Sequence, residues 1–268
     1  MSGVVGIISE RDCKENLFYA TDYHSHLGTS FGGLAVSDGK SLVKKIHSIA
    51  RAQFKSRFDE DIDFINMRGN SGIGVISDRD TQPLIMRLKF GEYALCGTGY
   101  IDNQNELAQR LIDEGVVFSE MPNGKVNQIE LAAKLINKGQ DLVEGIEYLH
   151  KQIDGSMSLL LLGKEGIYAA RDKYGRTPLV LAEKDGAKIV VSETCAYKNL
   201  GFNTKKYLGP GEIVFLDNKE CKYLRKPDKI LQLCTFLFVY AGFPASEYEE
   251  RNVEDFREKS GRIIARQD

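Results

Sequence analysis

MSGVVGIIS, residues 1–9, opens the chain with a short apolar run behind a serine. The run Val4–Ile8 is rich in β-branched residues and predicts a buried strand. Ser2 is a small polar residue of the kind that permits removal of an initiator methionine. What this serine does at the start of a predicted strand depends on the rest of the chain.

Two groups of predicted strands enclose a set of central helices. The strand segments are short runs of β-forming residues bounded by turn signals: residues 32–46 with an Asp-Gly turn, 72–77, 82–88, 92–100, 158–163, 166–172, 178–193 with a turn at Asp185–Gly186, and 211–217. The helical segments are residues 17–19, 103–115, 126–139 and 141–153, and Asn127 and Glu130 have the spacing of a capping box. This order predicts an α+β fold with two mostly antiparallel sheets packed face to face and helices outside.

Composition excludes several classes of protein. The chain has 268 residues, of which 42% are hydrophobic and 28% charged, with a formal net charge of −2. It has neither a dense basic patch for nucleic acid nor an apolar run of the ~20 residues that a membrane span requires. The five cysteines form no CxxC pair, and no secretory signal precedes the first strand. We therefore expect a cytoplasmic protein that binds neither nucleic acid nor membrane.

Further segments carry a resemblance to a known family. They are SGVVGI (residues 2–7), RDKYGRTPL (171–179), SETCA (192–196), LGPGEIV (208–214) and the region from Cys234 to the end. In this order they resemble the N-terminal glutaminase domain of amidophosphoribosyltransferases. These are class II glutamine amidotransferases of the Ntn-hydrolase fold, in purine nucleotide biosynthesis. The resemblance implies a four-layer αββα sandwich and a C-terminal phosphoribosyltransferase domain, and we expect a homo-oligomer.

The resemblance also assigns catalytic positions. The family motif has cysteine where this chain has Ser2, and that residue attacks the glutamine amide with its own α-amine as the base. The family's oxyanion hole uses an asparagine amide and a glycine N–H. Here these positions are Thr98 and Gly99, so one strong hydrogen-bond donor is replaced.

The positions that would bind glutamine also differ. Ser77 stands where the family has an arginine for the α-carboxylate, and Gln128 where it has an aspartate for the α-amine. His26 opens the segment HLGT in place of His-Arg-Gly-Gln. We therefore predict that glutamine hydrolysis is lost, although Arg79 or Arg87 is close enough in sequence to supply a guanidinium.

Ser2 alone leaves three explanations open: an alternative nucleophile, a natural loss of activity, or a laboratory substitution. A laboratory substitution would have altered Ser2 and left the other positions intact. Two functions follow from the remaining explanations. The first is a non-catalytic scaffold or ligand-binding domain, for a small molecule other than glutamine. The second is an active Ntn amidohydrolase or amidotransferase that uses Ser2.

Cofactors are not expected. His24 and His26 are two residues apart, but no Cys, Asp or Glu cluster accompanies them, which favours a structural or solvent-facing role over a metal site. Cys234 stands where one branch of the family has an Fe–S ligand. Its partner cysteines would lie beyond this chain, so a free core thiol is expected there.

The chain divides into two parts on the resemblance. Residues 1–233 form the amidotransferase-like domain, and residues 234–268 connect it to the phosphoribosyltransferase domain, which we expect outside this chain. The pattern over residues 252–266 predicts a helix with an exposed apolar stripe, and hence self-association.

Overall fold

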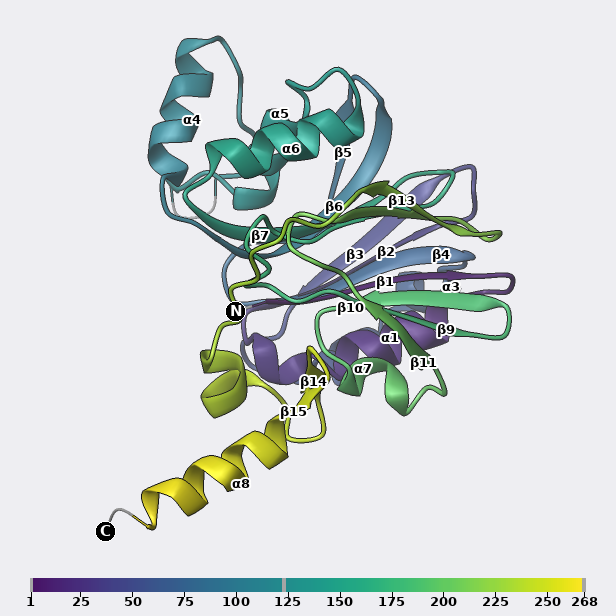
Figure 1. Cartoon of the computed structure of the whole chain (residues 1–268). Helices are drawn as coiled ribbons and strands as arrows, with labels where there is room; N and C mark the ends of the chain where they lie inside the picture. Colours follow the sequence, from purple (N-terminus) through teal and green to yellow (C-terminus); the bar gives the residue numbers. More distant parts are fainter. Residues whose placement is uncertain (1, 122–123, 267–268) are drawn as a thin grey trace.

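Two antiparallel β-sheets packed face to face form the body of the molecule (Figure 1). The computed structural model describes residues 2–121 and 124–266. The first sheet has seven strands in the order β11-β9-β10-β1-β4-β2-β3. Its strands are β1 (Ser2–Ser9), β2 (Phe31–Ser37), β3 (Leu42–Ser48), β4 (Ser71–Ser77), β9 (Val180–Lys184), β10 (Ala187–Val191) and β11 (Asn203–Tyr207). Strand β1 is therefore the central strand of this sheet.

The second sheet has six strands in the order β13-β12-β8-β7-β6-β5. They are β5 (Leu84–Leu88), β6 (Gly91–Ile101), β7 (Gly155–Leu162), β8 (Ile167–Ala170), β12 (Ile213–Leu216) and β13 (Cys221–Arg225). Two of the four edge strands, β11 and β13, were not predicted from the sequence. Most of their side chains are exposed or half-buried, so no apolar alternation marks them.

The side chains of β1 alternate between two apolar layers. Val4 and Ile8 belong to the layer between the two sheets. Val5 and Ile7 belong to the layer between the first sheet and its helices. Both faces of the strand are buried, which is why its sequence is a continuous apolar run.

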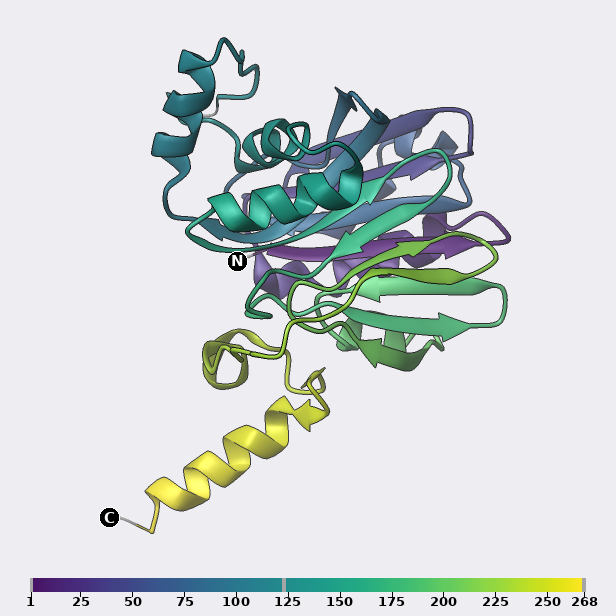
Figure 2. The same cartoon turned by 45° about the horizontal axis from the view of Figure 1, so that its top comes forward.

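Helices cover the outer face of each sheet (Figures 1 and 2). The second sheet is covered by α4 (Gln104–Asp113), α5 (Gln128–Ile136) and α6 (Leu142–Gln152). The first sheet is covered by α1 (Lys14–Asp22), α2 (Phe54–Asp59), α3 (Ile62–Asn66) and α7 (Cys195–Lys198). The predicted four-layer αββα sandwich is confirmed.

At the start of helix α5, one of the two hydrogen bonds of the predicted capping box is present. The Asn127 side chain accepts a hydrogen bond from the Ile129 N–H at 2.8 Å. Glu130 does not return a bond to Asn127, because the Asn127 N–H already donates to the Glu120 carbonyl. The Glu130 carboxylate instead accepts from the N–H groups of Ser119 and Glu120 at 3.0 and 2.7 Å. The reciprocal half of the capping box was wrong.

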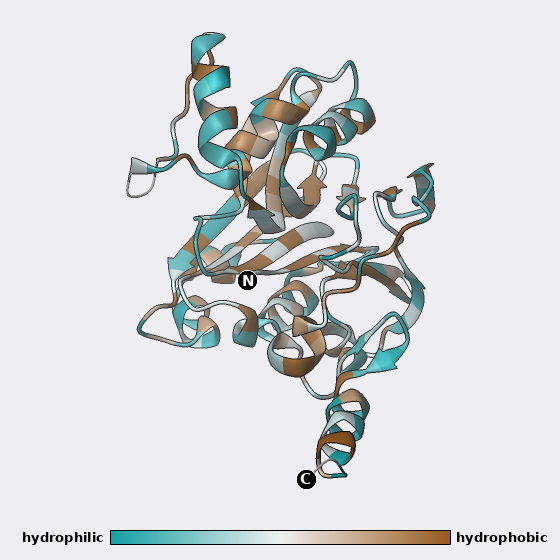
Figure 3. Cartoon of the chain, turned by 60° about the vertical axis from the view of Figure 1, so that its left-hand side comes forward, coloured by the Kyte–Doolittle hydropathy of each residue, from teal (hydrophilic) through white to brown (hydrophobic). Residues whose placement is uncertain are grey.

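The C-terminal segment leaves the two sheets and carries its own small apolar cluster. It contains the π-helical turn η3 (Leu237–Ala241), the strands β14 (Glu247–Tyr248) and β15 (Arg251–Asn252), and helix α8 (Val253–Ile264). Helix α8 points away from the body, as the figures show from two directions. Hydrophobic residues lie near its C-terminal end (Figure 3), where Ile263 and Ile264 are 58% and 61% exposed. The predicted helix is confirmed, but its apolar stripe is exposed only at the C-terminal end, because Val253 is buried and Phe256 packs against the same small cluster.

In the described part of the chain, no helix is both long and apolar enough to cross a membrane.

Candidate functional site

A cavity of about 420 Å³ lies where the apolar layer between the sheets gives way to polar residues. Ser2, Thr98, Ser156 and Ser192 each lie two or four residues along the chain from an apolar residue of that layer, and so share its face. The described residues that line the cavity are Ser2, Leu27, Asp78, Arg79, Thr98, Gly99, Tyr100, Gly155, Ser156, Arg176, Thr177, Pro178, Ser192, Cys234, Leu237 and Tyr248.

Ser2 starts the central strand and is held there by hydrogen bonds. Its Cα pairs with that of Ser77 across β1 and β4. Its carbonyl oxygen accepts a hydrogen bond from the Thr98 hydroxyl at 2.5 Å. Two residues on, the Val4 N–H donates to the Ser192 hydroxyl oxygen at 2.9 Å. The hydroxyl of Thr98 is therefore engaged with the chain rather than directed at a ligand.

The backbone conformation at position 99 requires a glycine. Its φ angle is +134°, and a Cβ atom there would lie 1.9 Å from the Ser156 carbonyl oxygen. Any larger residue would displace β7 from β6. Of the positions that the resemblance assigned, Ser2, Thr98 and Gly99 meet at the cavity.

Ser77 lies outside the cavity wall, 1% exposed. Its hydroxyl oxygen accepts a hydrogen bond from Gln82 Nε2 at 3.2 Å. The other end of that amide, Gln82 Oε1, accepts from the Gly97 N–H at 2.9 Å. Gln82 thus bridges the two sheets beside Ser77.

Gln128 also lies outside the cavity wall. Its Oε1 accepts from the Ile101 N–H at 2.9 Å, and its Nε2 donates to Asp80 Oδ2 at 3.2 Å. Burial raises the pKa of Asp80 above its ordinary value, although the hydrogen bonds from Gln128 oppose the shift. Gln128 therefore joins the start of α5 to the end of β6 and to the loop after β4.

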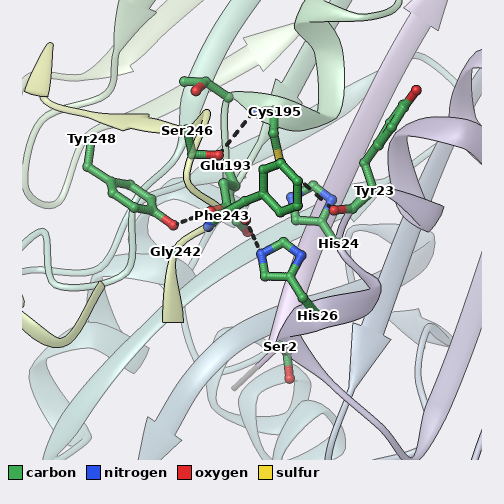
Figure 4. Close-up of polar contacts among 12 residues, drawn as sticks. Ser2, Tyr23, His24, His26, Glu193, Cys195, Gly242, Phe243, Ser246 and Tyr248 are labelled. Atoms are coloured by element: carbon green, nitrogen blue, oxygen red, sulfur yellow. Dashed lines mark hydrogen bonds and ion pairs between the residues drawn. The ribbon is translucent and has the colours of Figure 1, made fainter. Parts of the chain in front are cut away.

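His26 takes part in a network around Glu193, which is fully buried (Figure 4). His26 Nε2 lies 2.6 Å from Glu193 Oε2. The other oxygen accepts from the Phe243 N–H at 2.6 Å and from the Tyr248 hydroxyl at 2.7 Å. Burial alone would raise the pKa of Glu193, but the contact with His26 holds it below its ordinary value. His26 lines a neighbouring groove, which shares Leu27, Asp78 and Cys234 with the cavity.

His24 is a buried structural residue. Its Nδ1 lies 2.9 Å from the Ala20 carbonyl oxygen, and the side chain is 0% exposed. Burial lowers its pKa to about 4, so the ring is neutral near pH 7. Within the described residues, no cluster of three or more His, Cys, Asp or Glu side chains could hold a metal ion.

Cys234 is a free thiol, but it is exposed and lines the cavity. The expectation of a core thiol was wrong, because the segment after β13 runs across the surface rather than into an apolar layer. The remaining cysteines are buried at Cys13, Cys96 and Cys195 and half-buried at Cys221.

Other lining residues were not found from the sequence. Ser156, Ser192 and Arg176 reach the wall from three separate elements. The alternation of polar and apolar residues along β7 and β10 was the signal for the two serines, since each continues the inter-sheet face. No local pattern marks Arg176.

Comparison with known proteins adds to this geometry. A family model described as a glutamine amidotransferase domain matches residues 70–199. The amidophosphoribosyltransferase of Methanothermobacter thermautotrophicus is 26% identical over 279 residues, which covers 99% of this chain and 57% of the relative. That of Methanocaldococcus jannaschii is 26% identical over 294 residues, covering 100% and 61%.

Solved structures show the same fold. The glutamine phosphoribosylpyrophosphate amidotransferase of B. subtilis, solved with ADP and GMP, superimposes with a TM-score of 0.89 at 24% identity, covering 99% of this chain and 58% of that one. A structure described as the allosteric regulatory enzyme of purine biosynthesis gives 0.89 at 23% identity, with the same coverage.

Residues 70–199 thus match a glutamine amidotransferase domain, and the chain has the fold of the corresponding part of the solved amidotransferase structures. Its relatives over the whole length are amidophosphoribosyltransferases, as the sequence motifs predicted. The chain spans 57% and 61% of the length of these two relatives.

Proposed function

We propose that this amidophosphoribosyltransferase-like domain no longer hydrolyses glutamine and serves as a ligand-binding or scaffold domain in a protein of the purine-biosynthesis family. The observation that carries the proposal is the contact between Ser77 and Gln82. At the position where the family has a guanidinium, a short side chain is closed off by a buried amide that bridges both sheets.

The other glutamine-binding positions support the same conclusion. The Thr98 hydroxyl donates its hydrogen bond to the Ser2 carbonyl oxygen. It therefore does not act as the oxyanion-hole donor that an asparagine amide provides in the family. The Gln128 amide is used by Ile101 and Asp80, and it offers no negative charge to an α-amine. At positions 77, 98 and 128, the group that the family uses for glutamine is replaced, and the side chain present is bonded within the protein.

A second candidate function is an active amidohydrolase that uses Ser2. One observation favours it: Ser2 lines an open cavity beside Gly99, at the end of the central strand. A serine in this place is a weaker nucleophile than a thiol and depends on a well-placed base.

The wider setting is also a proposal. We expect a phosphoribosyltransferase domain as the partner of this domain, a homo-oligomeric assembly and a cytoplasmic location. A domain boundary near residue 233 is supported by the separate apolar cluster of Leu237, Phe238, Tyr248 and Val253.

The test is ammonia release from glutamine by the wild type, by Ser2→Cys, and by Ser2→Cys combined with Ser77→Arg, Thr98→Asn and Gln128→Asp. The combined variant is made with and without Gln82→Ala, because Gln82 occupies the space beside Ser77. We expect no activity in the first two proteins. Three lost contacts of about 1.5–3 kcal/mol each lower the rate by a factor on the order of 10³–10⁶.

Mass spectrometry must first confirm removal of Met1, and circular dichroism that each variant is folded. Hydrolysis of glutamine by the wild type would overturn the proposal. Covalent labelling of Ser2 by an amide-mimicking electrophile, without glutamine hydrolysis, would favour the second function.

A further inference from the structure

Two arginines from different elements line the cavity. Arg79 follows β4, and Arg176 lies in the turn between β8 and β9. Within the described part of the chain, neither guanidinium makes an ion pair with a carboxylate, although Arg176 Nε donates to Gln232 Oε1 at 2.8 Å. Asp78 is the one carboxylate among the described lining residues. The wall therefore carries more positive than negative charge.

Arg79 is exposed and packs on Tyr100, which in turn pairs with Ser156. The guanidinium carbon of Arg79 lies 4.3 Å from the centroid of the Tyr100 ring. Tyr100 is the direct cross-strand partner of Ser156 between β6 and β7. These three side chains come from the loop after β4 and from two strands, so the sheet fixes two of them in place.

The hydroxyl of Ser156 is the unusual member of this group. The residue is 8% exposed, and its Oγ has no hydrogen-bond partner among the residues that the structure describes. A buried hydroxyl without a partner costs stability unless something else binds it. The oxygen itself is buried, but Ser156 lines the cavity, and a change of its side-chain rotamer would turn the hydroxyl towards a ligand there.

Much of the remaining wall is apolar. Leu27, Pro178, Leu237 and the ring of Tyr248 face the same space. A ligand here would have an apolar body against these residues and a polar end near Arg79 and Ser156. Arg79 and Ser156 differ from the positions at which the family resemblance places the glutamine contacts.

We propose that the cavity binds a small molecule with an apolar body and one anionic group, a carboxylate or a phosphate, held by the Arg79 guanidinium and the Ser156 hydroxyl. The inference rests on the proposed function, in that the domain binds a ligand other than glutamine. Arg176 contributes a second positive charge to the same cavity wall.

Three probes of similar shape test this: phenylacetate, phenyl phosphate and the neutral phenylacetamide. Their dissociation constants are measured by NMR titration at low ionic strength, on the wild type, Arg79→Gln, Ser156→Ala and the control Arg87→Gln. Arg87 is an exposed arginine of β5 that does not line the cavity. The two anionic probes distinguish a carboxylate ligand from a phosphate ligand.

We expect at least one anion to bind about tenfold or more tightly than the amide. Arg79→Gln should remove that preference, and Ser156→Ala should weaken binding of the anion. Arg87→Gln should change neither the preference nor the affinity for the anion. Equal binding of all three probes, no saturation by either anion up to about 10 mM, or the same loss in Arg87→Gln would overturn the inference.

The two proposals fail separately in these experiments. Ammonia release by the wild type would overturn the proposed loss of glutamine hydrolysis, whatever the probes do. Absence of anion preference in a protein that releases no ammonia would overturn the ligand assignment alone.

Discussion

The cavity and the Glu193 network are neighbouring regions that differ in whether their buried polar groups are bonded within the protein. Tyr248 belongs to both, since its ring lines the cavity and its hydroxyl donates to Glu193. Glu193 Oε1 accepts two hydrogen bonds, and Oε2, which accepts none with hydrogen-bond geometry, lies 2.6 Å from His26 Nε2 (Figure 4). The hydroxyl of Ser156 has no hydrogen-bond partner among the described residues. The comparison separates a group that holds the structure together from a group available to a ligand.

The Glu193 network fixes one wall of the cavity. The next two residues continue the attachment: the Thr194 hydroxyl oxygen accepts from the Glu247 N–H at 2.8 Å, and the Cys195 N–H donates to the Ser246 hydroxyl at 3.3 Å. Three successive residues after β10 therefore hold the segment before helix α8. Loss of this attachment would move Tyr248 away from the cavity.

The largest effect expected is that of Glu193→Ala. Removal of one partner from a buried charged network costs about 3–5 kcal/mol of unfolding free energy, because the others lose their hydrogen bonds. The control is Glu183→Ala, which breaks the surface pair with Lys205 at 3.2 Å and should cost under about 1 kcal/mol. Urea denaturation followed by circular dichroism measures both.

Hydrogen exchange should then rise at residues 243–248 in Glu193→Ala and not in Glu183→Ala. Equal destabilisation by the two substitutions would remove the distinction between the network and an ordinary surface pair.

The second effect is a loss of stability in mild acid. Burial lowers the pKa of His24 and of His150 from 6.5 to about 4 in the folded protein. The unfolded chain therefore binds more protons between these values, so stability is complete above about pH 6.5 and is lost as the pH falls towards about 4, by roughly 3 kcal/mol per histidine.

Urea midpoints at about pH 7.5 and about pH 5 measure this change. His24 faces Glu193 and His26, whereas His150 lies nearest to Asp172, Lys173 and Arg225. His150→Gln keeps a donor for the Met157 carbonyl and removes one titrating group. It should reduce the pH dependence, and an unchanged dependence would contradict the assignment. The lowered pKa of Glu193 acts below its ordinary value of 4.5, outside this window.

Most of the fold could be predicted from the sequence, because the pattern of buried apolar side chains along the chain determines the strands and helices. Val4–Ile8 gave the central strand, and the N-cap at Asn127 and the glycine at Gly186 gave element ends. Of the four edge strands, β11 and β13 were missed because their exposed residues carry no such period, whereas β3 and β5 lay within predicted segments. The family motifs further predicted that Ser2, Thr98 and Gly99 meet.

The contacts within the site could not be predicted. Gln82 reaches Ser77 and Gly97 across two sheets, and Glu193 reaches residues more than 150 positions away on one side and 50 on the other. Such contacts depend on the packed arrangement of strands, which no local pattern contains. The absence of a partner for Ser156 is likewise visible only once β6 and β7 are paired.

The smallest effect comes from two serines of one strand, and it tests the comparison most directly. Ser158 is fully buried; its oxygen accepts from the Asp172 N–H at 2.9 Å and its hydroxyl lies 2.8 Å from the Thr177 carbonyl oxygen. Ser158→Ala should therefore cost roughly 1–3 kcal/mol of unfolding free energy, because the Asp172 N–H loses its acceptor.

Ser156→Ala removes a hydroxyl with no described partner, so unfolding free energy should stay the same or rise by up to about 1 kcal/mol, while affinity for the anionic probe falls. Urea denaturation without a ligand and with the tighter-binding anion, phenylacetate or phenyl phosphate, measures both quantities on the same samples. A comparable loss of stability in the two variants would show that Ser156 is bonded within the protein, and the contrast between the two regions would then fail at the residue on which it depends.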